Sequence, residues 1–130
     1  MRLFHLGIDA HVVGDMTSPP LGVGDLLIVS AGPGDFATIE ALTNIARTAG
    51  AKTAVVTARI SSNLARHADV VLHIPAQTMV NDQAGKLSVL PMGSLFEASL
   101  MLVFELVILR LRDRLGETLE SIRARHTNLE

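Results

Sequence analysis

The chain has 130 residues, which suffices for one domain around a single hydrophobic core. Apolar residues make up 48% and charged residues 18%, as in a globular protein, and the net charge of −2 without a Lys/Arg cluster argues against a nucleic-acid partner. The absence of cysteine excludes disulfides and thiolate metal sites and fits a reducing compartment, so we expect a cytoplasmic protein.

The first residues read as the end of a helix, with Gly7 as its left-handed stop. No charged head followed by a long apolar run precedes Gly14, so no secretory signal is predicted. Ala10–Val13 is then predicted as a short strand. The following residues 15–24 hold two prolines and two glycines and are predicted as a loop.

Strands and helices alternate in the middle of the chain. Leu26–Ser30 is a continuous apolar run between turn residues, as in a buried parallel strand. Apolar residues at helical spacing follow and stop at Gly50. The pattern then predicts a strand at Thr53–Thr57, a short helix through Ala65, and a strand at Val70–Ile74. The alternation predicts one α/β domain with a parallel sheet over residues 1–130.

A long helix dominates the last third of the chain, after an irregular segment at Ala76–Leu90. Ser94 and Glu97 have the spacing of a capping box, and apolar residues then surround most of the helix. The uncharged run is too short for the ~20 residues of a membrane span. We therefore expect no membrane contact and a helix buried against its own sheet and a second subunit. A short helix at Glu117–Arg125 and a polar tail end the chain.

Ligands of parallel sheets bind outside the carboxyl ends of the strands. Three segments meet that condition, namely Ala31–Asp35, Thr57–Ser62 and Gly93–Glu97. The first joins a strand to a helix start, where backbone N–H groups favour an anion. A tight turn with Asp35 as helix cap explains the same glycines, and the sequence alone favours this simpler interpretation. The candidate ligand-binding residues are Gly32, Gly34, Asp35, Thr38, Thr57, Ser61 and Ser62.

Glu97 has two equally weighted interpretations. It is either the capping-box partner or a general base at the mouth of the sheet, partly desolvated by Leu95 and Phe96. His126 lies in a polar tail that composition alone marks as a solvated terminus. The other histidines lack metal-ligand spacing, so no metal site is expected.

Several segments together resemble the sugar isomerase (SIS) domain family, in particular its 6-phospho-3-hexuloisomerase-like branch. They are Gly24-Asp-Leu-Leu-Ile, Gly50-Ala-Lys, Ala68-Asp-Val-Val, Pro91-Met-Gly-Ser-Leu-Phe-Glu and Arg125-His-Thr-Asn-Leu-Glu. The resemblance implies a flavodoxin-like three-layer sandwich with helices on both faces of a parallel sheet. It also implies a homodimer or homotetramer assembled through the long helix Ser94–Arg114.

The same resemblance implies a sugar-phosphate ligand and isomerisation through a cis-enediol, without metal or organic cofactor. Glu97 would be the base that moves the proton beside the carbonyl. His126 would be a second proton-handling group that reaches a neighbouring subunit's site.

Two departures from the family separate the hypotheses. The family's Ser-Gly-Ser-Gly-Glu-Thr loop reads Ala31-Gly-Pro-Gly-Asp-Phe here, so its hydroxyls are lost and Pro33 removes an N–H donor. The family's opening helix and first strand also have no counterpart, which predicts a sandwich truncated at its N-terminus. The leading hypothesis is a phosphosugar isomerase. The alternative is a non-catalytic sugar-phosphate-binding or oligomerisation module, which the lost hydroxyls favour.

Overall fold

The computed structural model describes residues 1–82 and 88–129. The chain divides into two compact units, which are described separately. One unit consists of Pro20–Leu100. The other combines Met1–Pro19 with Met101–Glu130. Nothing in this division tests the predicted single domain, which stays a prediction.

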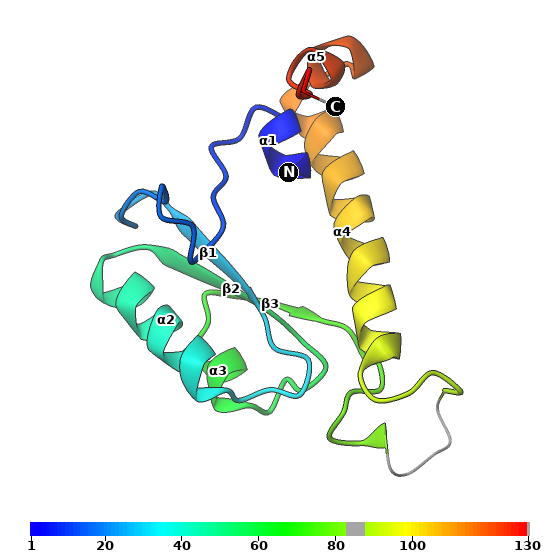
Figure 1. Ribbon diagram of the computed structural model, residues 1–130. Helices are drawn as coiled ribbons and strands as arrows, with labels where there is room; N and C mark the ends of the chain where they lie inside the picture. The colour runs from blue at the N-terminus through cyan, green and yellow to red at the C-terminus, as the bar shows by residue number, and fades with distance from the viewer. Residues whose placement is uncertain (83–87, 130) are drawn as a thin grey trace. The chain divides into compact units, whose positions relative to one another are not determined.

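The Pro20–Leu100 unit is built on a parallel sheet with the strand order β1-β2-β3 (Figure 1). The strands are β1 at Leu26–Ser30, β2 at Lys52–Thr57 and β3 at Val70–His73. Helix α2 (Ala37–Thr48) connects the first two strands and α3 (Asn63–Arg66) the last two. These elements confirm the predicted α/β class and its three central strands, with β2 starting one residue earlier and β3 ending one residue earlier than predicted.

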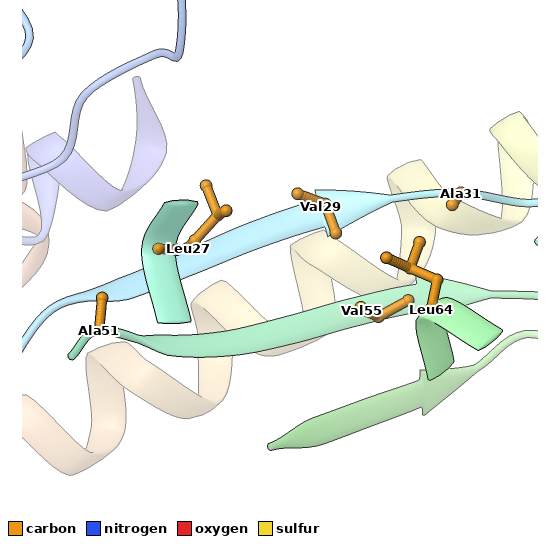
Figure 2. Close-up of a cluster of buried hydrophobic side chains, with 7 residues drawn as sticks. Leu27, Val29, Ala31, Ala51, Val55 and Leu64 are labelled. Carbon is orange, nitrogen blue, oxygen red and sulfur yellow. The ribbon is translucent and has the colours of Figure 1, made fainter. Parts of the chain in front are cut away.

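The core of this unit lies on one face of the sheet. Leu27 and Val29 alternate with exposed neighbours along β1, and Leu27 pairs in register with Thr53, as Val29 does with Val55. Figure 2 shows Val29, Val55 and Leu64 gathered where α3 covers the strands. Ala46 of α2 is fully buried against the same cluster. Alternate positions of a strand face opposite sides, so this burial fixes the register.

The opposite face of the sheet keeps apolar side chains at its surface. Leu26 is 50% exposed, Ile28 40% and Val70 56%. Leu26 and Ile28 alternate along β1 with the buried residues, and Val70 pairs in register with Ala54, the partner of Ile28. The continuous apolar run of β1 predicted burial on both faces, which is wrong for this chain by itself.

The predicted strand at Ala10–Val13 is also wrong, since these residues form irregular chain and a turn. A strand exists only with a hydrogen-bonding neighbour. Among the described residues β1 pairs with β2 alone, and Ala10–Val13 has no strand partner. Local apolar alternation was therefore insufficient to make a strand.

The second unit contains the short helix α1 (Arg2–His5) and the final helix α5 (Leu119–Ala124). Gly7 ends α1 with a φ of +79°, as predicted. Thr118 and Ser121 cap α5 reciprocally through side chain and backbone. An ion pair joins Arg2 to Glu105.

Helix α4 (Ser94–Leu115) begins in the first unit and continues through the second. Phe96 is the one buried residue of this helix in the single chain, so the predicted burial against a second subunit stays a prediction. Met101, Leu102 and Leu106 are each more than 60% exposed. The described part of the chain contains no helix of sufficient length and apolar character to cross a membrane.

The segment predicted as irregular, Ala76–Leu90, contains neither α-helix nor β-strand at residues 76–82 and 88–90. The remaining residues of that prediction, 83–87, lie outside the described part of the chain.

Candidate active site

The three predicted segments come together at the carboxyl ends of the strands. The ring of Phe96 packs on Gly32, where a Cβ would lie only 2.7 Å from the Phe96 Cδ1. A Cβ on Gly34 would lie 3.0 Å from the Ser62 Cβ and 3.1 Å from the Arg59 Cδ. The loop after β1 thus contacts the loop after β2 through Gly34, and the start of α4 through Gly32. Both contacts require a residue without a side chain.

The loop after β1 leads into the first turn of α2. Ala31 donates its N–H to the Val56 carbonyl at 2.8 Å, and Gly34 donates to the Ala31 carbonyl at 2.9 Å. Gly34 has a φ of +107°, which favours glycine for a second reason. Helix α2 starts at Ala37, and its first N–H groups have no partner within the helix. Twelve residues of aligned peptide dipoles make this start attractive to an anion.

The turn interpretation predicted that Asp35 caps α2, and this prediction is wrong. The N-cap of α2 is Phe36, without a side-chain hydrogen bond. The Asp35 carboxylate instead accepts a hydrogen bond of 3.0 Å from the Leu64 N–H in the first turn of α3. A residue that follows β1 in sequence therefore stabilises the helix that follows β2.

Two of the predicted ligand-binding hydroxyls are used inside the protein. Thr57 is fully buried, donates to the Gly32 carbonyl at 3.4 Å and accepts from the Arg59 N–H at 3.0 Å. Ser62 is 1% exposed and caps α3 by accepting from the Ala65 N–H. Thr38 and Ser61, in contrast, are exposed. They are the hydroxyls of the predicted set that a ligand can reach.

Arg59 is a candidate that sequence reasoning missed. It is exposed, it follows β2, and its aliphatic stem packs beside Gly34 of the neighbouring loop. Arg59 forms no ion pair with any other described residue. A guanidinium binds phosphate oxygens with charge-assisted hydrogen bonds. Its position between Thr57 and Ser61, two residues already singled out, was the available signal.

Glu97 does not serve as the capping-box partner of Ser94, the structural role that the sequence suggested for it. Helix α4 begins at Ser94 itself, and the Glu97 N–H donates 3.0 Å to the Gly93 carbonyl. Within residues 88–129 the Ser94 side chain makes no hydrogen bond to the Glu97 backbone, and the Glu97 side chain makes none to the Ser94 backbone. The predicted capping box is therefore wrong. Phe96 turns into the core and leaves Glu97 exposed, which contradicts the expected partial desolvation within this chain.

The loop before α4 is held in an unusual conformation. Met92 has a φ of +52°, and among the described residues it is the one non-glycine residue with positive φ. Backbone strain of this kind costs of order 1 kcal/mol and persists where the surrounding structure enforces it. Gln77 is 3% exposed, and its amide donates to the carbonyls of Leu90 and Met92 at 3.3 and 3.4 Å. Gln77 therefore stabilises the turn that precedes α4 and so helps to position Glu97.

Other polar groups of this unit lie apart from these loops. A cavity of about 250 Å³ between α2 and α3 is lined by residues that include Thr43, Arg47 and Thr53. Lys52 and the Thr53 N–H hold the pKa of the Asp69 carboxyl down at about 2. Thr53 and Asp69 stand at the amino ends of β2 and β3, so this pairing stabilises the sheet and is not part of the candidate site. Among the described residues no group of three or more His, Cys, Asp or Glu is arranged to hold a metal ion.

Residues 4–102 match the model of the SIS domain family. The chain belongs to the SIS domain family. Proteins named 3-hexulose-6-phosphate isomerase from Bacillus subtilis and Mycobacterium gastri are 34% and 40% identical to this SIS domain over 130 residues. These alignments cover 100% of this chain but 70% and 65% of the two relatives.

Two crystal structures resemble the SIS domain closely. They belong to a hypothetical protein and to a hypothetical protein of Methanococcus jannaschii with an inferred molecular function of 3-hexulose-6-phosphate isomerase. The TM-scores are 0.86 and 0.85, each at 28% identity. The alignments cover 98% and 99% of this chain and 68% of each of the other chains. The predicted SIS-type fold and the predicted family are confirmed, and the chain spans about two thirds of the length of these neighbours.

The predicted site residues do not all lie in the same compact unit of the SIS domain. Gly32, Gly34, Thr57, Ser62 and the exposed Glu97 share the cluster of three loops. His126 belongs to the other compact unit, where its ring lies 5.0 Å from that of His5. The catalytic and binding roles of all these residues stay predictions.

Proposed function

We propose that this SIS domain is a sugar-phosphate isomerase and that its substrate is a 3-hexulose 6-phosphate. The observation that carries the proposal is the packing of Phe96 on Gly32, which leaves Glu97 exposed at the carboxyl end of the sheet, with no side-chain hydrogen bond or ion pair to any other described residue. The names of the relatives from Bacillus subtilis and Mycobacterium gastri support this substrate class.

In the proposed reaction the Glu97 carboxylate removes the proton from the carbon next to the carbonyl. The electron pair of that C–H bond forms the carbon–carbon double bond of a cis-enediol, and the carbonyl oxygen takes up a proton. A proton then returns to the former carbonyl carbon while the hydroxyl on the adjacent carbon loses its proton, which leaves the carbonyl on that adjacent carbon. General acid–base catalysis of this kind contributes ~10²–10⁴-fold to a rate.

Two groups beside this base are proposed to hold the phosphate. One is the set of N–H groups at the start of α2, with the exposed hydroxyls of Thr38 and Ser61. The other is the guanidinium of Arg59, which substitutes for the hydroxyls that the Ala31–Phe36 loop lacks. Of the two Asp35 carboxylate oxygens, Oδ1 accepts a hydrogen bond from the Leu64 N–H of α3.

His126 is proposed as the second proton-handling group, which transfers a proton between the two enediol oxygens. As the family resemblance implies, it would serve the site of a second copy of the chain. This arrangement requires a homo-oligomer. We propose a homodimer or homotetramer that forms through α4, where Leu102, Leu106 and Leu109 follow helical spacing and are each 47–63% exposed.

The cytoplasm is the proposed location, since phosphorylated sugars are substrates of internal metabolism and the chain lacks cysteine. Cell fractionation with an antibody against the chain tests this location.

The proposed activity is tested by incubating the protein with a panel of hexulose, hexose and pentose phosphates and following the products chromatographically. Conversion of a 3-hexulose 6-phosphate supports the proposal. A protein whose melting temperature rises with a sugar phosphate that it does not convert is a binding module instead. The specific observation in favour of that alternative is the loop after β1, which offers no side-chain hydroxyl.

A further inference from the structure

Arg125 joins three segments of the terminal unit through its guanidinium. Its Nη1 and Nη2 donate to both carboxylate oxygens of Glu117, at 2.8 and 3.0 Å. Nη1 also donates to the carbonyl of His5 at 3.0 Å. The Ser121 hydroxyl donates to the same Glu117 carboxylate. Such a two-pronged pair fixes the plane of the guanidinium as well as its position.

Glu117 stays ionised and Arg125 stays protonated at neutral pH. The hydrogen bonds from Arg125 and then from Ser121 lower the pKa of Glu117, and the bond to Glu117 raises the pKa of Arg125. Both groups therefore stay charged across the range in which an imidazole titrates.

Gly7 provides the surface on which the guanidinium rests. A Cβ at Gly7 would lie 3.1 Å from both Cζ and Nη2 of Arg125. The φ of +79° at Gly7 is a second obstacle to a side chain there. Since His5 is the last residue of α1, its carbonyl lacks an intrahelical partner, and Arg125 supplies one.

The next residue after Arg125 is His126, whose ring has two neighbours. The ring of His126 lies against that of His5 in a tilted arrangement, with centroids 5.0 Å apart and planes inclined by 38°. Its Nδ1 lies 3.0 Å from the carbonyl oxygen of Thr127. A carbonyl oxygen only accepts hydrogen bonds, so Nδ1 carries the proton in the neutral ring. Nε2 is then the basic nitrogen, on a residue that is exposed.

We infer that Arg125 is a positioning residue for His126. Arg125 pairs with Glu117, packs on Gly7 and donates a hydrogen bond to the His5 carbonyl. It thereby fixes the position of His5, whose ring lies against that of His126. The His126 Nε2 then faces outward as the proton acceptor. This inference rests on the proposed function, in which His126 transfers a proton. It also gives a physical reason for arginine directly before histidine in the tail.

The first test measures the ring itself and requires no activity. Nitrogen-15 NMR of the full chain distinguishes the two neutral tautomers of His126 in the wild type, in Arg125→Ala and in Arg125→Lys. The inference predicts a single Nδ1-protonated tautomer in the wild type and a mixture in Arg125→Ala. Arg123→Ala, which alters an exposed arginine in the last turn of α5, serves as control and should match the wild type. An unchanged His126 tautomer in folded Arg125→Ala overturns the inference.

The second test uses turnover. Arg125→Ala should lower kcat at least tenfold with KM within about twofold, and Gly7→Ala should act in the same direction if Arg125→Ala fails to fold. In a His126→Gln background Arg125→Ala should lower kcat no further, since it acts through the imidazole. Additive losses would assign Arg125 a purely structural role and overturn the inference. A wild type without turnover whose His126 tautomer still depends on Arg125 would contradict the proposed function and leave the positioning intact.

Discussion

The ring of Phe96 occupies the space in which Gly32 would carry a side chain, with the Cδ1 only 2.7 Å from the position of that Cβ. This contact fixes the start of α4 against the end of β1. Because Glu97 is the next residue in the helix, the same contact determines where its carboxylate emerges. A packing interaction thus sets the position of the proposed base.

Gly32→Ala should consequently impair catalysis without touching a reacting group. Forcing a methyl group against Phe96 costs about 1–3 kcal/mol of stability and shifts the start of α4. Phe96→Leu removes the ring atoms that clash, so the double variant should recover part of the stability that Gly32→Ala loses. Urea unfolding of the wild type, both single variants and the double variant measures this coupling. Strictly additive effects would show that the two residues do not constrain each other.

Arg59→Ala should raise the KM for the sugar phosphate about tenfold or more and leave kcat nearly unchanged. A hydrogen bond to a charged group contributes about 1.5–3 kcal/mol. Arg59→Lys should recover part of the loss, since it keeps the charge but not the fork of donors. Steady-state kinetics decide the matter, with Arg66→Ala on the exposed surface of α3 as the matched control. Equal KM values for Arg59→Ala and the control would remove Arg59 from the site.

The pairing of Asp69 with Lys52 predicts a specific acid sensitivity. The folded state holds the pKa of Asp69 at about 2, below the ~3.9 of an unfolded aspartate. The pairing therefore stabilises the fold above about pH 4, and this contribution disappears as the pH falls through about 2. Melting temperatures of the wild type and Asp69→Asn should converge between pH 4 and 2. Lys52→Met should show much of the same change, because Lys52 is the main cause of the lowered pKa. Parallel curves over this range would refute the assignment.

Leu106→Asp should dissociate the proposed oligomer. Leu106 is 61% exposed in the single chain, so the change should alter the intrinsic stability of the subunit by only about 0.5 kcal/mol. At an apolar contact between subunits the same carboxylate would be buried without a partner. Sedimentation velocity measures the assembly, and Arg110→Ala on the same helix is the control. A Leu106→Asp protein that sediments as the parent assembly would exclude this face of α4 from the interface.

Local patterns predicted the elements whose stability is decided locally. The apolar run Leu26–Ser30 and the glycine stops at Gly7 and Gly50 are confirmed. Ala10–Val13 failed because a strand depends on a neighbour that the pattern cannot reveal. The apolar character of α4 likewise does not say which partner covers it, so its burial against a second subunit stays a prediction.

The site could be placed from the sequence but not built from it. Three segments at the ends of strands were enough to locate it, because parallel sheets gather those ends. The contacts inside it join residues far apart in the chain, as Asp35 with Leu64 and Gly34 with Arg59 show. No local pattern predicts that Asp35 caps a later helix or that an arginine stem packs on a distant glycine.

The central claim is that Glu97 removes the proton beside the substrate carbonyl. Its most direct test is the rate of deuterium incorporation at that carbon in deuterated water, for the wild type and for Glu97→Gln with a bound 3-hexulose 6-phosphate. The account predicts exchange in the wild type and a loss of ~10²-fold or more in Glu97→Gln, with an unchanged melting temperature because the side chain is exposed. Exchange at the wild-type rate in Glu97→Gln, or a wild type that binds the sugar phosphate without any exchange, would contradict it.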